Sequence, residues 1–238
     1  FRLLKEIGRH PNICQLLEFV EKEHHSYAVL ELLDDVSLRP FIKKNSLSLE
    51  KRIELISQLL EAMSFVHGKG IVHGDIHLSN VLIHRGNKVK LIDFNMSNRL
   101  QPAENEIVRE GGVYQYIPPE KVDARAFRMV KGMADRCSEV FQLGVVMYYV
   151  FYQKMPFEDF TWQKLAIRIA EEKPTFPAQT PIGCEVPGWV LRMMKKSLAK
   201  DPAKRFPSAV EQSQKWNSLR KKYIIERDHI FPKTAPAL

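Results

Sequence analysis

The chain has 238 residues, of which 45% are hydrophobic and 27% charged, and its formal net charge is +8. This length suits one domain with a sizeable core, and the composition is typical of a soluble globular protein. The positive charge favours anionic partners. However, the sequence contains no zinc-ligand spacing, no aromatic RNA-binding motif and no basic heptad pattern, so we expect no nucleic-acid binding.

Cysteine spacing and apolar run length predict the compartment. The three cysteines, Cys14, Cys137 and Cys184, follow neither a disulfide nor a metal-binding spacing, which predicts a reducing, cytoplasmic location. The longest apolar run, residues 140–151, is too short to cross a bilayer, so we expect no membrane span. The oligomeric state does not follow from these features.

The first part of the chain predicts a helix end, two strands and a long helix. Residues 1–8 resemble the end of a helix, and residues 14–20 and 26–33 have the pattern of strands joined by a polar connection. Ser48 is a good helix N-cap, and apolar residues then recur at alternating three- and four-residue steps. Gly68 and Gly70 end this helix.

The second part of the chain predicts one strand pair and, beyond residue 137, only helices. Short apolar strands at residues 81–83 and 89–92 flank a polar turn. Residues 138–151 are apolar on nearly all faces, which indicates a central buried helix. Further helices are expected at residues 161–172, 187–198 and 208–226, before a loose tail at 231–238. This order predicts an α+β fold dominated by its helical part.

The most informative motif is HGDIHLSN at residues 73–80, followed by LIDFN at residues 91–95. It contains Asp75, then Asn80 five residues later, then Asp93 after the next predicted hairpin. Phosphoryl transfer from ATP requires oxygen ligands for Mg²⁺ and a carboxylate that orients the attacking hydroxyl and accepts its proton. Asp75 is therefore the candidate catalytic base, and Asn80 and Asp93 are the candidate metal ligands.

These motifs resemble those of the protein-kinase superfamily, whose catalytic loop is His-Arg-Asp with Asn five residues later, and whose metal loop is Asp-Phe-Gly. The resemblance covers nearly the whole chain, because further segments follow the family's order. These are HPNI at 10–13, LELL at 30–33, YIPPE at 116–120 and DPAKR at 201–205. The resemblance implies a protein-kinase-like two-lobed fold, with a partial small lobe at 1–33, a helical large lobe at 34–230 and a tail at 231–238.

The resemblance also implies ATP and Mg²⁺ as cofactors and assigns the nucleotide contacts. Leu30, Glu31 and Leu33 would lie at the hinge, where backbone groups meet adenine, and Leu82 would form the floor of the adenine pocket. Asn80 and Asp93 would hold the metal ion next to the phosphates.

Two further pairs of residues are expected to be structural. Glu120 and Arg205 would form a buried ion pair between the segment that closes the activation loop and a late loop. His73 and Phe94 would pack in the core of the large lobe rather than contact substrate.

Several departures from the family pattern affect function. The 238 residues contain no glycine-rich loop and no strand lysine for the α- and β-phosphates, so we expect either a truncated small lobe or a lost nucleotide grip. Gly74 replaces the Arg that pairs with a phosphorylated activation loop, which argues against control through that contact. His77 replaces a catalytic Lys, although it can still donate a hydrogen bond to the transferring group.

Two milder replacements concern the backbone and the buried helix. Asn95 replaces the Gly of Asp-Phe-Gly, and Asn tolerates the left-handed conformation that Gly permits. Glu139 replaces an Asp at the start of the central buried helix, which conserves the charge.

Three functions remain open from the sequence. The first is ATP-dependent phosphoryl transfer to serine or threonine hydroxyls of proteins, with Asp75 as base and His77 assisting. The second is a catalytically inactive pseudokinase scaffold, which the departures favour. The third is a small-molecule kinase of the same fold, although those relatives generally lack the Pro-Pro-Glu segment. The basic residues within 121–136 either favour acidic protein substrates or form a solvated loop.

Overall fold

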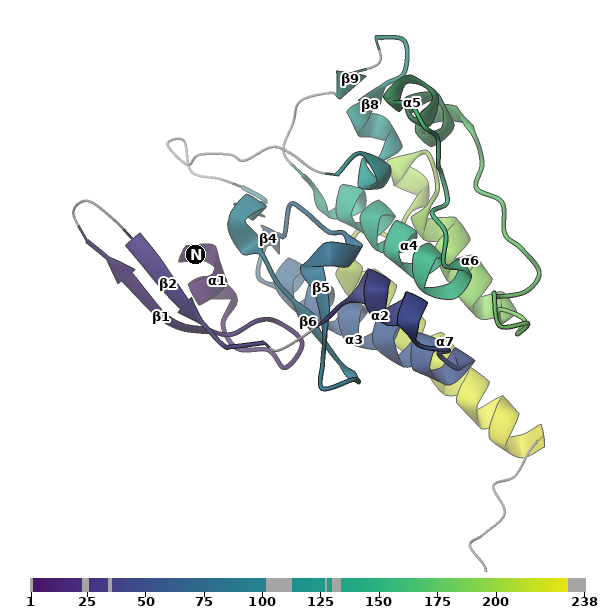
Figure 1. The fold of residues 1–238 in the computed structure, drawn as a ribbon, viewed down its shortest axis with the longest axis horizontal. Helices are drawn as coiled ribbons and strands as arrows, with labels where there is room; N and C mark the ends of the chain where they lie inside the picture. The colour runs from purple at the N-terminus through teal and green to yellow at the C-terminus, as the bar shows by residue number, and fades with distance from the viewer. Residues whose placement is uncertain are drawn as a thin grey trace, which may run out of the picture.

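The computed structural model describes residues 2–22, 26–33, 36–101, 113–126, 128–129 and 134–230. A small part containing the N-terminal strands adjoins a larger helical part (Figure 1). The helices are α1 (Arg2–Ile7), α2 (Leu38–Lys44), α3 (Leu49–Gly68), α4 (Arg136–Tyr152), α5 (Trp162–Glu171), α6 (Gly188–Ser197) and α7 (Ala209–Ile230). The strands are β1 (Leu16–Glu21), β2 (Ser26–Leu30), β3 (Val36–Ser37), β4 (Ile71–Val72), β5 (Val81–His84), β6 (Lys88–Leu91), β7 (Asn98–Arg99), β8 (Val122–Asp123) and β9 (Arg128–Met129). This arrangement confirms the predicted α+β class.

The N-terminal hairpin is joined to the helical part through β6. Strands β1 and β2 pair antiparallel, and β5 pairs with both β3 and β6 in a separate sheet. The backbone of the segment before β1 continues this second sheet on its β6 side: Cys14 N donates to Leu91 O at 2.8 Å, and Leu91 N donates to Asn12 O at 2.8 Å. The β1–β2 hairpin therefore lies beside the turn that follows β6.

The helical core is built around α4, as the sequence predicted. Every residue from Ser138 to Tyr152 is buried, and α4 contacts α3, α6 and α7. The expected N-cap of α3 is also present, since the Ser48 side chain accepts a hydrogen bond from Lys51 N. None of the helices in the described part of the chain is long and apolar enough to cross a membrane.

Helix α2 was not predicted from the sequence. It spans seven residues and has Pro40 in its first turn, where the missing N–H would have no helical partner in any case. Leu38 and Ile42 hold α2 in place because both side chains are buried. The predicted tail at 231–238 lies outside the described residues.

The predicted ion pair between Glu120 and Arg205 is present and is bidentate. Arg205 Nη1 and Nη2 donate to the two carboxylate oxygens of Glu120 at 2.8 and 2.7 Å. The Arg205 side chain is 0% exposed and that of Glu120 is 23% exposed. Arg205 also donates to the backbone oxygens of Ala199, Cys137 and Lys200, so its guanidinium joins three segments of the large helical part.

Replacing Glu120 with alanine should destabilise the fold by about 3 to 5 kcal/mol, because Arg205 is left as a buried charge without its carboxylate. Chemical denaturation measures this difference. The matched control is Glu226→Ala, which removes an exposed pair with Lys222 at 3.7 Å and should cost about 0.5 kcal/mol or less. Equal effects of the two substitutions would show that the buried pair does not stabilise the large helical part.

Candidate active site

The loop between β4 and β5 is anchored by a buried histidine. His73 is fully buried, its Nε2 donates to Ile92 O at 2.9 Å, and its ring lies 4.5 Å from that of Phe94. Burial lowers the pKa of His73, so the ring stays neutral. Both aromatic side chains therefore pack in the core, as expected from the sequence.

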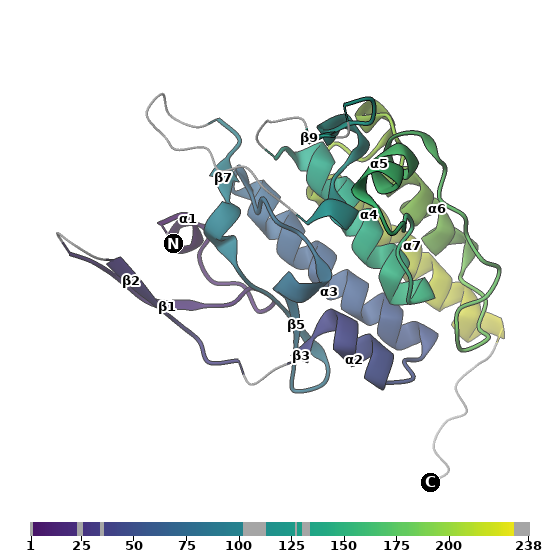
Figure 2. The same cartoon turned by 45° about the horizontal axis from the view of Figure 1, so that its top comes forward.

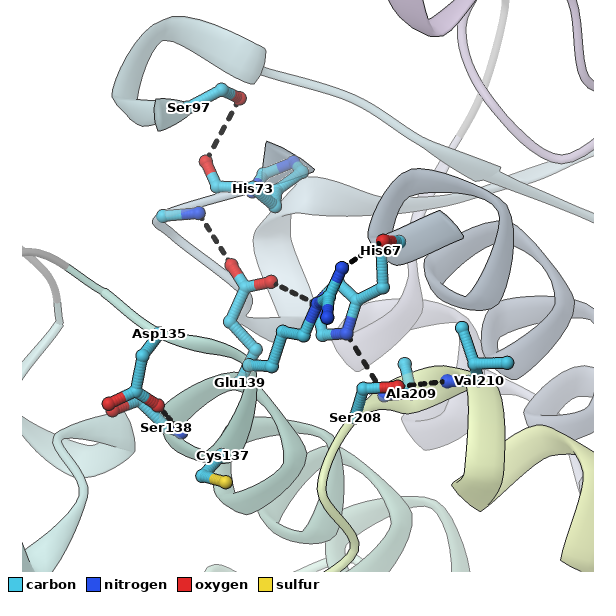
Figure 3. Close-up of polar contacts among 12 residues, drawn as sticks. His67, His73, Ser97, Asp135, Cys137, Ser138, Glu139, Ser208, Ala209 and Val210 are labelled. Atoms are coloured by element: carbon cyan, nitrogen blue, oxygen red, sulfur yellow. Dashed lines mark hydrogen bonds and ion pairs between the residues drawn. The ribbon is translucent and has the colours of Figure 1, made fainter. Parts of the chain in front are cut away.

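The buried carboxylate of Glu139 fixes the next residue of this loop (Figure 3). Its Oε1 accepts a hydrogen bond from Gly74 N at 2.6 Å, and its Oε2 accepts one from His67 Nε2 at 2.7 Å. His67 Nδ1 accepts from Ala209 N at 2.9 Å, which leaves the proton on Nε2. One side chain of α4 thus connects α3, the catalytic-type loop and the start of α7.

Both the backbone conformation and the neighbouring atoms favour glycine at position 74. Its φ is +87°, in the region that side chains with a Cβ rarely adopt. A Cβ at this position would lie 2.0 Å from Met96 O. A side chain at this position would therefore require the Met96 carbonyl to shift.

Gly74→Ala should destabilise the protein by about 2 kcal/mol or more, through the left-handed conformation and the contact with Met96 O. The control is Gly68→Ala, whose added Cβ meets no atom within 4 Å and should change stability by less than about 1 kcal/mol. Thermal unfolding of both variants measures the difference. A Gly74→Ala protein as stable as Gly68→Ala would contradict the assigned backbone conformation.

The candidate base, Asp75, lies in a network of short polar contacts. Asn80 Nδ2 donates to the backbone oxygen of Asp75 at 2.9 Å and to its Oδ2 at 3.3 Å. His77 Nε2 lies 3.3 Å from the same Oδ2, and His77 Nδ1 accepts from Ser79 N. Partial burial opposes ionisation of Asp75, but the hydrogen bond and charge of His77 outweigh it and lower the pKa of this carboxyl. Asp75 is thus an ionised, oriented carboxylate.

Asp93 begins the turn after β6. It has a left-handed backbone with φ 63° and ψ 71°, and its Oδ1 accepts from Asn95 N at 3.3 Å, at the start of the 3₁₀ helix η2 (Phe94–Met96). We expected Asn95 to use its tolerance of the left-handed region. That expectation is wrong, because Asp93 takes the left-handed conformation and Asn95 lies within the 3₁₀ turn.

A pocket of about 320 Å³ joins the N-terminal hairpin to this turn. Its lining includes Asp93 and the four predicted adenine contacts, which are Leu30, Glu31, Leu33 and Leu82. The pocket therefore brings together residues that are up to about 60 positions apart in the sequence. Asp75, His77 and Asn80 are not among its lining residues. They are connected to it through the backbone, since Ile92 N donates to Asn80 O at 3.0 Å directly before Asp93.

Five lining residues were not among the predicted nucleotide or metal contacts: Leu4, Cys14, Ile92, Phe94 and Asn95. The last three adjoin Asp93 in the sequence, which is the one signal that could have pointed to them. Burial, together with the charge of Glu31, raises the pKa of Cys14 to about 11, so this thiol stays protonated at neutral pH.

Lys90 is a further residue that sequence reasoning missed. Its Nζ pairs with Glu31 Oε1, and its side chain is nearly buried. Burial opposes ionisation of Glu31, but the hydrogen bonds from Lys90 and from Gln15 N lower the pKa of that carboxyl. Because Glu31 N also donates to Gln15 O at 2.9 Å, neither its side chain nor its amide N–H is free for a ligand.

The donor set fits a hard divalent cation. Asp93 presents an exposed carboxylate, and Asn80, whose amide nitrogen is engaged by Asp75, has its carbonyl oxygen left as a possible ligand. Within the described residues, no group of three or more His, Cys, Asp or Glu side chains could hold a metal ion. Mg²⁺ typically takes one or two protein carboxylates and completes its shell with phosphate and water, so this sparse set suits it.

Comparison with known proteins agrees with this geometry. The family model described as protein kinase domain matches residues 1–216 of the chain. Sperm motility kinase 2B of Mus musculus is 32% identical over 174 residues, which cover 73% of this chain and 34% of that protein. Probable serine/threonine-protein kinase PknB of Lactococcus lactis subsp. lactis is 27% identical over 239 residues, which cover 96% of this chain and 36% of that protein. The chain thus spans about a third of the length of these curated relatives.

Proposed function

Because this chain belongs to the protein kinase domain family, we propose that it transfers the γ-phosphate of ATP to serine or threonine hydroxyls of protein substrates. The observation that carries the proposal is the pocket that contains Leu30, Leu33, Leu82 and Asp93, connected through Ile92 to the Asp75 network. The division into a partial small lobe at 1–33 and a large lobe at 34–230 is part of this proposal.

The nucleotide would lie with its adenine in the apolar part of this pocket. Leu30 and Leu33 would flank the ring, and Leu82 would support it from the side of β5. Glu31 would contribute its backbone carbonyl, since its amide N–H and its carboxylate are already engaged. A few directed polar groups on apolar walls are typical of small-ligand pockets.

Asp93 and Asn80 would hold Mg²⁺ beside the phosphates. When bound, this ion neutralises negative charge on the transferring group. The protein's own contribution is orientation: the turn that begins at Asp93 fixes the carboxylate, and the contact with Asp75 fixes the amide of Asn80.

Asp75 would orient the attacking hydroxyl and accept its proton. Its lowered pKa keeps the carboxylate ionised at neutral pH, which is the state required of an acceptor. His77, hydrogen-bonded to Asp75 Oδ2, would lie next to the transferring phosphate and would donate a hydrogen bond to it. A protonated His77 would also supply the positive charge that a lysine gives in this position.

A surface for a protein substrate adjoins this loop. Tyr116 OH accepts from Leu78 N at 3.3 Å, which connects the closing segment to the loop of Asp75. The neighbouring pocket of about 320 Å³ is lined by residues of that segment and of the approach to α5, including Tyr114, Phe160 and Trp162. This open, partly aromatic surface suits a polypeptide better than a small molecule, so it disfavours the small-molecule kinase. A preference for acidic substrates and a cytoplasmic location remain predictions.

The alternative function is a scaffold without catalysis, which the replacements at Gly74 and His77 favour. Asp75→Asn separates the two. It should reduce phosphoryl transfer to a general acceptor protein by about 10²- to 10⁴-fold while leaving binding of Mg²⁺ and ATP intact, because only the proton acceptor is lost. Radiolabel transfer from ATP measures the rate, and Asp228→Asn at the end of α7 is the control. A wild-type chain that binds the nucleotide but transfers no phosphate would instead establish the scaffold.

His77→Lys should increase the transfer rate at neutral pH, because it replaces a conditional charge with a permanent one. Radiolabel transfer from ATP to the general acceptor protein measures both rates. A rate for His77→Lys no higher than that of the wild-type chain would contradict a role for His77 beside the transferring phosphate.

A further inference from the structure

A third pocket lies between α6 and α7, apart from the candidate active site. Its volume is about 610 Å³, and none of its lining residues belongs to the site described above. Both views place α6 and α7 on the side of the molecule away from the β1–β2 hairpin (Figures 1 and 2). We refer to it as the α6–α7 groove, with a floor formed by Met193, Phe206 and Leu219 and a rim that includes Arg192, Lys196 and Lys215.

The floor of the α6–α7 groove is apolar and belongs to the core. Met193 is 2% exposed and Phe206 is 5% exposed, and Leu219 is a partly buried side chain packed against the core cluster. Only a few apolar atoms of these side chains are therefore accessible to solvent in the α6–α7 groove, and the hydrophobic core holds them in place. Such a floor offers a place for one apolar side chain of a ligand.

The rim is strongly basic. Arg192 and Lys196 are four residues apart on α6, so both project on the same helix face, and Lys215 faces the groove from α7. All three are exposed, and none forms an ion pair with a carboxylate within the described residues. Lys196 Nζ lies 4.4 Å from the centre of the Phe206 ring, which holds this ammonium group over the floor.

One carboxylate, that of Glu211, also lines the groove. A hydrogen bond from the Ser208 hydroxyl lowers the pKa of Glu211, so the Glu211 carboxylate is ionised. Ser208 directly precedes α7, so this carboxylate is already engaged at the start of its own helix. Three cations therefore face one engaged carboxylate. The balance of charge around the α6–α7 groove is positive, and its complement is an acidic ligand.

We propose that the α6–α7 groove docks an acidic peptide segment of a partner protein, with one apolar side chain of that segment seated on Met193, Phe206 and Leu219. The concave shape between two helices fits an extended or helical peptide rather than the flat surface of a membrane. A nucleic acid is disfavoured because Phe206 is the single aromatic residue among the described lining residues, whereas single-stranded nucleic acids stack successive bases on several aromatic rings. The proposal does not depend on phosphoryl transfer, since it uses none of the residues of the candidate active site.

Fluorescence anisotropy with a labelled peptide of glutamates around a central Leu-Phe pair tests the proposal. Lys196→Glu and Lys215→Glu should each weaken binding by about tenfold or more, because each reverses a charge at the rim. The matched control is Lys44→Glu, an identical charge reversal on the exposed face of α2, which should change affinity less than about twofold. Because all three lysines are exposed, the variants should unfold at the wild-type temperature, which a thermal melt verifies.

A second peptide, in which Ala-Ala replaces Leu-Phe, tests the apolar floor. It should bind about tenfold more weakly than the first peptide, and higher ionic strength should weaken both. Absence of binding, equal affinity of the two peptides, or equal losses for Lys44→Glu and the rim variants would each overturn the proposal. Binding to phosphatidylserine vesicles through Lys196 and Lys215, without binding of the Leu-Phe peptide, would assign the α6–α7 groove to a membrane surface instead and would also overturn it.

Discussion

The carboxylate of Glu139 lies in the middle of the helical part, and both of its oxygens accept hydrogen bonds from other segments. A buried charge is tolerated only where its hydrogen bonds are made, so the surrounding chain must bring its donors to this point. Gly74 N and His67 Nε2 supply them, and His67 in turn receives the first free N–H of α7 from Ala209. The position of the loop that contains Asp75 is therefore set by α4, the most buried helix of the fold.

The second requirement of the site is a connection between the hairpin and the helical part. The backbone bonds between Cys14 and Leu91 provide it, because they fix β1 and β2 relative to the turn of Asp93. The pocket exists only where these two parts meet, with Leu30 from one and Leu82 from the other. The proposed nucleotide contacts and metal ligands thus come from segments that are distant in sequence and belong to separate sheets.

Much of the fold and the components of the site could be predicted from the sequence. Period and capping signals predicted α3 and α4. The chemistry of phosphoryl transfer indicated Asp75 as the candidate base and Asn80 and Asp93 as the candidate metal ligands. What could not be predicted depends on tertiary contacts. The link between Lys90 in β6 and Glu31, the residue that follows β2, joins two segments with no common sequence pattern. The replacement at Gly74 gave no sign in the sequence of its positive φ or of the nearby Met96 oxygen. The expectation for Asn95 was wrong because the conformation of the whole turn, and not the residue type alone, determines which residue is left-handed.

The central claim is that the pocket and Asp93 together bind a nucleotide with its metal ion. Thermal unfolding of the chain with ATP, with and without Mg²⁺, tests it most directly, because a ligand that binds only the folded state raises its apparent stability. At a hundredfold excess over Kd we expect a rise of about 5 °C or more that requires Mg²⁺ and is lost in Asp93→Asn. A rise that is independent of Mg²⁺, or of the same size in Asp93→Asn, would contradict the assignment of Asp93, and no rise at all would contradict nucleotide binding by this chain.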